Sequence, residues 1–224
     1  MPFFKCDAGL VFFFHVPKCG GSSVEHALQK NGHKLSFFDT GFMSNMNNMW
    51  YKSSPQHITY SDYKTLFKED IFFYKFTVVR EPVSRFLSAF NANRFRIGKH
   101  TSFKRFLSAL EKNITVGNDY FGKRFDNHFL PSSRFIPEQC DIFHLEKDMQ
   151  KLQTVLSKKT KIDIDMSVKD NVGKYKSKKS DTSHYGFKRF FFPPSPQKHE
   201  LCDDTLGRIR NLYREDYERF NFEF

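Results

Sequence analysis

The feature that most constrains this chain is the passage over 11–30, VFFFHVPKCGGSSVEHALQK. A short β-branched and aromatic run bounded by Gly9 and Pro17 predicts a buried strand over 10–16, and residues 22–30 carry a helical pattern. A lysine, two glycines and two serines lie between them. Glycines let backbone N–H groups approach an anion, and a helix N-terminus offers unpaired donors and a positive dipole end. The passage therefore predicts an anion-binding loop, with Ser22 or Ser23 near the start of the helix.

A second passage, VVREPVSRFLSAF at 78–90, repeats this design. A strand is predicted over 71–79 and a helix over 81–95. Arg80 lies at the tip of the strand, and Ser88 lies about two turns into the helix. In a parallel sheet both strands end at the edge where ligands of open α/β sheets bind. Two anion-binding strand ends at one edge predict a ligand with two separated anionic groups.

The rest of the chain continues the alternation of strands and helices. A third strand is predicted over 140–146, and further helices are predicted over 61–68, 102–113, 147–158 and 203–220. A Lys/Ser-rich stretch at 157–189 reads as a long loop. This order predicts an α/β fold of three layers, with a mostly parallel central sheet and a P-loop-like strand–loop–helix nucleotide site. We find no linker, and we expect a single domain over 1–224.

Composition limits the classes of partner. The chain has 36 Lys and Arg against 25 Asp and Glu, a net charge of +11, which favours polyanionic partners such as a nucleotide, a nucleic acid, an acidic glycan or a membrane surface. Its four cysteines form no CxxC and no Cys/His cluster with zinc spacing, so we expect neither a metal site nor a disulfide framework. No apolar run approaches about 18 residues. We expect no membrane span and a cytoplasmic location.

The two passages together resemble a known enzyme family. HVPKCGGSS is similar to the 5′-phosphosulfate loop, and VVREPVSRFLSAF to the 3′-phosphate segment, of sulfotransferases that use 3′-phosphoadenosine 5′-phosphosulfate (PAPS). The resemblance is greatest to the carbohydrate O-sulfotransferases, including the heparan and chondroitin enzymes. Weaker similarities follow in the family's order at 126–135, 140–152 and 212–222. One departure lies in the loop, where Cys19 stands at a position at which the family commonly has threonine.

The resemblance implies a role for each matching residue. Lys18 would neutralise charge on the bridging oxygen as the S–O bond breaks. Arg80 and Ser88 would hold the 3′-phosphate. No metal is implied. The loop that would hold the 5′-phosphate consists of Lys18, Cys19, Gly20, Gly21, Ser22 and Ser23.

A hydroxyl acceptor needs a general base, and histidine suits that task near neutral pH. Related carbohydrate sulfotransferases place a base histidine in a stretch similar to the one that contains His57, so His57 is our first candidate. His128 is the second candidate, or it shapes the acceptor cleft. We expect His15 to pack beside the loop and fix it, and Arg85 to form a surface ion pair.

Two other functions stay open at this point. A P-loop nucleotide kinase is disfavoured because Lys18 precedes the glycines, whereas in a Walker A loop the lysine follows them. A basic nucleic-acid-binding module would use the lysines of 157–189, but no recognisable nucleic-acid-binding motif is present. For a sulfotransferase we expect no nucleic-acid partner. The charge favours an acidic glycan as acceptor, and small hydroxylated metabolites remain alternatives. The oligomeric state is left open.

Overall fold

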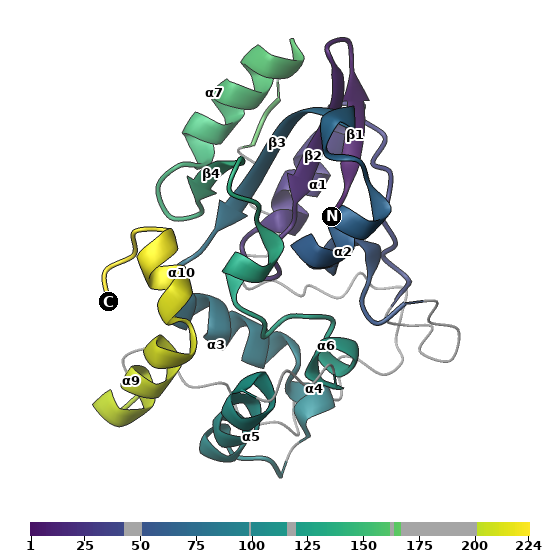
Figure 1. Cartoon of the computed structure of the whole chain (residues 1–224). Coiled ribbons are helices and arrows are strands. Elements are labelled where there is room, and N and C mark those ends of the chain that lie inside the picture. Colours follow the sequence, from purple (N-terminus) through teal and green to yellow (C-terminus); the bar gives the residue numbers. More distant parts are fainter. Residues whose placement is uncertain (43–50, 99, 116–119, 162–163, 167–200) are drawn as a thin grey trace, which may run out of the picture.

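The computed structural model describes residues 1–42, 51–98, 100–115, 120–161, 164–166 and 201–224 (Figure 1). They contain a four-stranded sheet in the order β1-β2-β3-β4. Its strands are β1 (Phe3–Cys6), β2 (Gly9–Phe14), β3 (Phe72–Val79) and β4 (Asp141–His144). Strands β2, β3 and β4 run parallel, whereas β1 is antiparallel to β2. The predicted mostly parallel sheet is confirmed, and its three parallel strands match the three predicted ones.

Strand β1 was not predicted. It forms a hairpin with β2, in which Phe3 pairs with Phe12 and Cys6 with Gly9. The turn ends at Gly9, whose φ of +137° suits glycine far better than any other residue. Four residues are too few for a clear alternating pattern, which is why sequence reasoning missed the strand. Because β1 covers one side of β2, the strand that leads into the anion loop lies inside the sheet.

Helices cover both faces of the sheet, as the expected three layers require. Along β2, Val11 and Phe13 face the core formed with α1 and α7, whereas Phe12 and Phe14 face the core formed with α2. The 3-10 turn η5 (Ser132–Phe135) and the end of α10 complete that second face. The covering helices are α1 (Gly21–Lys30), α7 (Met149–Thr160) and α2 (Tyr60–Leu66).

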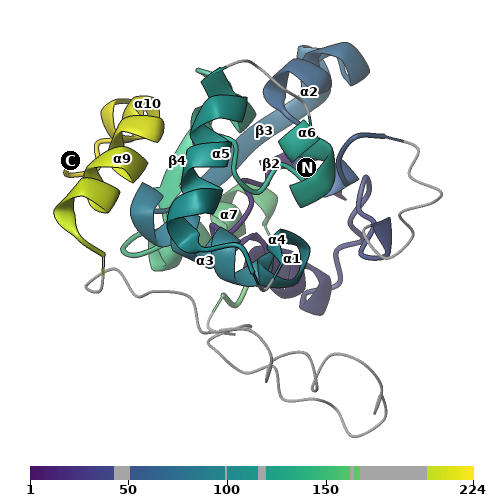
Figure 2. The ribbon, with the colours of Figure 1, turned by 90° about the horizontal axis from the view of Figure 1, so that it is seen from below.

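A third core lies beyond the carboxyl ends of the strands, on the side seen in Figure 2. Its helices are α3 (Pro82–Ala92), α4 (Arg94–Ile97), α5 (Phe103–Thr115), α6 (Tyr120–Phe125) and α9 (Asp203–Leu212), after which α10 (Arg214–Arg219) follows. Helix α6 was not predicted. The helices expected over 81–95 and 203–220 are each interrupted, at Asn93 and at Tyr213. The Tyr213 hydroxyl donates to the Phe129 carbonyl at 2.9 Å, which ties the break to the segment that carries His128.

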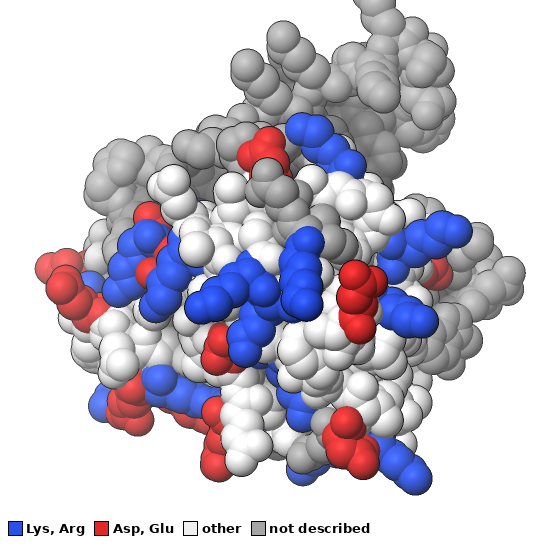
Figure 3. Space-filling view, turned by 90° about the horizontal axis from the view of Figure 1, so that it is seen from above, with Lys and Arg blue, Asp and Glu red and all other residues white. Residues whose placement is uncertain are grey.

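Positive charge is not confined to the carboxyl edge. Lys and Arg side chains gather near the middle of the face that Figure 3 shows, at the opposite end of the molecule from α3 and α5. Of the Lys/Ser-rich stretch, residues 157–160 close α7, and residues 167–189 lie outside the described part of the chain. Among the described residues, no helix is long and apolar enough to span a bilayer.

Candidate active site

The predicted anion loop connects β2 to α1 and has an unusual backbone. Lys18 has a φ of +68° and Gly20 a φ of +82°, both in the left-handed region. Gly20 is the N-cap, so α1 begins at Gly21 and the two serines lie in its first turn. The two serines thus lie near the start of the helix, as expected, and the cap itself is Gly20, because glycine tolerates this left-handed conformation without strain. The first N–H groups of α1, at Gly21 and Ser22, have no carbonyl acceptor inside the helix.

His15 supports the loop from beneath. A Cβ at Gly21 would overlap the His15 imidazole, so glycine is required at this close approach. The Nδ1 of His15 lies 2.5 Å from Oε1 of Glu25 in α1, and both side chains are buried. Burial lowers the pKa of His15, and the charge of Glu25 partly opposes that shift. The pair ties the end of β2 to α1, as expected of a residue that fixes the loop.

Two cations meet at the edge where β2 and β3 end. Arg80 follows β3 and donates from NH1 to the Lys18 carbonyl at 3.5 Å, while its buried Nε has no hydrogen-bond partner and lies 3.9 Å from Glu146. Within the described residues, no hydrogen bond or ion pair holds the Lys18 ammonium. Burial, and then the charge of Arg80, lower the pKa of Lys18. Two weakly held neighbouring cations form a site that an anion would stabilise.

The rest of the loop and α3 add little chemistry of their own. The Cys19 thiol is buried, and burial raises its pKa to about 12, so it stays protonated. Glu81 caps α3 by accepting from the N–H groups of Val83 at 3.1 Å and Ser84 at 2.8 Å. These two N–H groups are therefore not available to a ligand. The group that the end of β3 presents to an anion is the Arg80 side chain. Ser88 is half-buried in α3, and no hydrogen bond of its hydroxyl to the loop is recorded in the described structure.

A histidine–aspartate pair lies beside this edge. The Nδ1 of His57 lies 2.7 Å from Oδ2 of Asp126, which is buried and also accepts from the N–H and the hydroxyl of Ser54 at 2.6 and 2.9 Å. Burial alone would raise the pKa of Asp126, but the charge of His57 and its hydrogen bond hold that pKa well below the usual value. An ionised Asp126 keeps the His57 proton on Nδ1. The Nε2 of His57 is then left as a proton acceptor.

His128 is held in the opposite tautomer. Its Nδ1 accepts from the Asn93 amide at 2.7 Å. That amide is oriented by its bond to the Ala89 carbonyl and by Arg96, which donates to its oxygen at 3.3 Å. The proton of a neutral His128 therefore lies on Nε2, where it is a donor. Burial, and then the charge of His57, hold the pKa of His128 well below its usual value.

The three histidine rings form one chain of contacts. The centroid of the His57 ring lies 4.8 Å from that of His15 and 5.1 Å from that of His128. His57 ends a 3-10 turn (Pro55–His57), His15 follows β2, and His128 follows α6. The structure thus brings the anion loop and both base candidates together from three distant segments.

Donor atoms of His57, Asp126 and His128 lie within 4.8 Å of one another, a set that could hold a metal ion. Both Asp126 oxygens already accept hydrogen bonds, from Ser54 and His57. The charge of Lys18 also acts on His128. A carboxylate already engaged by three donors, with a cation nearby, favours proton transfer over metal binding.

The expectation that Arg85 forms a surface ion pair is wrong. Its side chain is fully buried, with Nε donating to the Pro17 carbonyl at 3.1 Å and NH2 to the Leu130 carbonyl at 2.6 Å. Its guanidinium also lies over the Tyr213 ring at 5.7 Å. Arg85 shares a helix face with buried Ala89, which is the signal that should have placed it inside. It joins the anion loop to the segment that follows His128.

Sequence reasoning also missed Asp126 and Asn93, the hydrogen-bond partners of the two base candidates. Asp126 stands two residues before His128 in the sequence DNH, and a carboxylate so close to a candidate base was a usable signal. Its actual partner is His57, at a separation in sequence that no local pattern reveals. Nothing in the sequence pointed to Asn93, which ends α3.

These observations define an α/β protein with a strand–loop–helix anion site next to a histidine–aspartate pair. The profile of the sulfotransferase family matches residues 1–223, and the chain belongs to that family. It is therefore a sulfotransferase, and neither the kinase nor the nucleic-acid-binding alternative is favoured. Comparison with curated proteins and with solved structures gave no match.

Proposed function

We propose that the protein transfers the sulfuryl group of PAPS to a hydroxyl acceptor, with the chain acting as one domain over 1–224. The observation that carries this proposal is the pair of weakly held cations, Lys18 and Arg80, at the shared edge of β2 and β3. Bound there, PAPS supplies a sulfuryl group activated by its bond to a phosphate. The residues that would hold it are Lys18, Cys19, Gly20, Gly21, Ser22, Ser23, Arg80 and Ser88.

The chain's own groups fit such a donor in two parts. The free N–H groups of Gly21 and Ser22, with the dipole of α1, suit the 5′-phosphate end. The buried Nε of Arg80 has no hydrogen-bond partner, only a long ion pair with Glu146 at 3.9 Å, and it suits a second phosphate. Bringing anionic groups to this edge also relieves the repulsion between Lys18 and Arg80. Ser88 is included on the resemblance of its motif.

Lys18 is proposed to act on the reacting centre. Sulfuryl transfer resembles phosphoryl transfer, in which the protein contributes positioning and charge stabilisation and little covalent chemistry. Negative charge grows on the bridging oxygen as the S–O bond breaks. An ammonium group placed there stabilises the transition state more than the ground state and so raises kcat. Lys18 is half-buried, and reduced contact with water strengthens that interaction.

His57 is proposed as the general base. With Nδ1–H donating to Asp126, its Nε2 can take the proton of the acceptor hydroxyl, and the carboxylate then stabilises the resulting imidazolium. His128 carries its proton on Nε2, and its lowered pKa keeps it neutral. It is suited to donate a hydrogen bond to the acceptor rather than to remove a proton. The geometry therefore supports His57 over His128.

The proposed acceptor is a carbohydrate hydroxyl. Support comes from the net charge of +11 and from the motifs, which resemble those of carbohydrate O-sulfotransferases. An acidic glycan fits that charge best, since surface lysines and arginines attract anionic chains.

The proposal is tested by offering radiolabelled PAPS with a panel of acidic oligosaccharides, neutral oligosaccharides and small alcohols. We expect labelled acceptor and adenosine 3′,5′-bisphosphate as the two products. The Lys18→Ala variant should form far less labelled acceptor. The exposed Lys112→Ala, in α5, serves as the charge-matched control. Transfer from magnesium ATP, with none from PAPS to any acceptor, would contradict the proposal and favour a kinase.

A further inference from the structure

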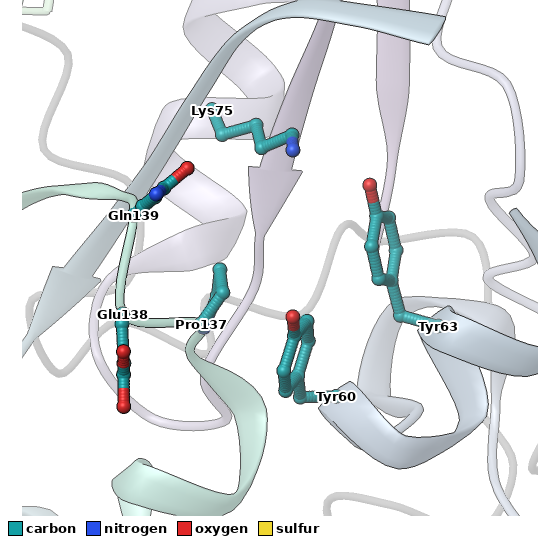
Figure 4. A pocket seen from close by; sticks show the side chains of 6 residues that line it. All are labelled: Tyr60, Tyr63, Lys75, Pro137, Glu138 and Gln139. Atoms are coloured by element: carbon teal, nitrogen blue, oxygen red, sulfur yellow. The ribbon is translucent and has the colours of Figure 1, made fainter. Parts of the chain in front are cut away.

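A polar cleft of about 350 Å³ lies on the face of the sheet that α2 covers, apart from the residues proposed to bind the donor (Figure 4). Strand β3, helix α2 and the segment after η5 each contribute to it. Its lining residues are Tyr60, Tyr63, Lys75, Pro137, Glu138 and Gln139. None of them has a role in the reaction described above.

Lys75 is the unusual residue of this cleft. It lies within β3, between the buried residues Tyr74 and Phe76, and pairs with the fully buried Phe12 of β2. Its side chain is half-buried, and in the described part of the chain no hydrogen bond or ion pair holds its ammonium. A lysine in the middle of a central strand loses hydration without a fixed partner. An anion in the cleft would supply that partner.

The other lining groups suit a sugar ring. Tyr60 offers a half-buried aromatic ring and its hydroxyl, and Gln139 offers an amide that both donates and accepts, whereas Tyr63 is buried and forms part of the wall. Glu138 adds one carboxylate to the single ammonium of Lys75. The cleft therefore favours a unit with one anionic group and several free hydroxyls over a unit with several anionic groups.

The cleft lies close to the active edge but not in it. Tyr60 begins α2 shortly after His57, and its ring centroid is 6.2 Å from that of Phe14, the residue before His15. From Lys75 to Val79, where β3 ends, the strand runs roughly 13 Å. A single sugar cannot fill the cleft and also present a hydroxyl at that edge. An oligosaccharide can.

We propose that this cleft is a specificity subsite that binds an acidic sugar unit of an oligosaccharide acceptor, with its carboxylate or sulfate on Lys75. This inference rests on the proposed function, since it assigns a place to part of the acceptor. Lys75 would determine which acceptors bind. It would leave donor binding unchanged.

The test uses isothermal titration of the whole protein with a hyaluronan tetrasaccharide, which carries carboxylates, and with tetra-N-acetylchitotetraose, a neutral chain of equal length. Expected is tighter binding of the acidic chain and a loss of roughly tenfold or more in Lys75→Ala, the value of one charge-assisted hydrogen bond. Lys158→Ala is the matched control, because Lys158 is exposed on α7, which covers the other face. It should bind the acidic chain as the unchanged protein does.

If Lys75→Ala bound the acidic chain as tightly as the unchanged protein, the inference would be overturned. The same holds if Lys158→Ala lost as much affinity as Lys75→Ala, because the attraction would then be non-specific. Free glucuronate binding as tightly as the tetrasaccharide would also overturn it, by showing a site for small anions. Adenosine 3′,5′-bisphosphate is titrated into the same proteins. Should the nucleotide fail to bind while the acidic chain still depends on Lys75, the proposed function fails and the cleft stands as a carbohydrate site.

Discussion

The two halves of the candidate site are built in different ways. The donor half, at 15–23 with Arg80, consists of two strand ends and the turns that directly follow them. The base half brings together His57, Asp126 and His128 from segments far apart in the chain. The first depends mainly on local backbone geometry, and the second on tertiary packing. Donor binding should therefore survive many changes that abolish proton transfer.

Two contacts limit that independence. The His15 ring, which supports the loop, lies against the His57 ring. Arg85 donates both to the carbonyl before Lys18 and to the carbonyl of Leu130. A change at either contact should affect both halves together, whereas a change at His57 or Lys18 should affect one.

The largest expected effect is that of replacing His57, which should affect the base half and leave the donor half unchanged. Replacing His57 by alanine removes the proposed base and should lower the rate of sulfuryl transfer by roughly 10²–10⁴. The affinity for adenosine 3′,5′-bisphosphate should hardly change, because His57 is not among the residues proposed to hold the phosphates. Single-turnover rates and nucleotide titrations on the same preparation measure both quantities.

Two further variants sharpen this result. Asp126→Asn removes the carboxylate that fixes the His57 tautomer, so its rate should fall less than that of His57→Ala while its nucleotide affinity stays normal. His128→Ala should raise the acceptor KM more than it lowers kcat. Near-normal turnover in His57→Ala together with loss of turnover in His128→Ala would reverse the assignment and make His128 the base.

The next largest effect is expected at Arg85, where one substitution should affect both halves of the site. Arg85→Met keeps the buried stem but leaves the carbonyls of Pro17 and Leu130 without their donors, which should lower the free energy of unfolding by about 3 kcal/mol. Nucleotide affinity and transfer rate should fall together, because both halves lose their common support. Urea unfolding and nucleotide titration provide the two measurements.

Arg134→Met is the matched control for that experiment, since Arg134 is exposed in η5. It should unfold at the urea concentration of the unchanged protein. If Arg85→Met were equally stable, or if it affected only one half, Arg85 would not be the link between them.

A smaller effect concerns the pH dependence of the donor half. Burial and the charge of Arg80 lower the pKa of Lys18, so its ammonium loses its proton at a lower pH than an ordinary lysine. The charged form is the one proposed to act, and kcat/KM for the donor, which reports groups of the free enzyme, should therefore decline as the pH rises through that lowered pKa. Arg80→Ala removes a neighbouring positive charge and should move the decline to higher pH. A decline that stays in place in this variant would assign it to another group.

The sequence predicted the donor half well, for a physical reason. The strands over 10–16 and 71–79 appear as β2 and β3, and the glycine-rich turn is a local structure with residue types of its own. The parallel order of strands then fixes the common edge. The serines lie in the first turn of α1, near its start as expected, and the left-handed backbone at Gly20 supplies the cap.

The base half could be predicted only in part. His57 and His128 were named as candidates, but their tautomers depend on Asp126 and Asn93, which the fold brings in from elsewhere. Arg85 was misread because a charged side chain usually lies at the surface, whereas here three backbone carbonyls, of Pro17, His128 and Leu130, replace water around it. The roles of Ser88 and of the rest of the loop remain predictions from the motif.

The central claim is that the edge shared by β2 and β3 binds a nucleotide with two separated phosphates. The most direct test is calorimetric titration of adenosine 3′,5′-bisphosphate into the unchanged protein, Arg80→Ala and Lys18→Ala. Binding should weaken by roughly 10- to 150-fold in Arg80→Ala, which corresponds to about 1.5–3 kcal/mol for a charge-assisted contact. Lys18→Ala should lose less affinity, since its main effect is on charge that develops during transfer. Unchanged affinity in Arg80→Ala, or equal binding of adenosine 5′-monophosphate, would contradict the account.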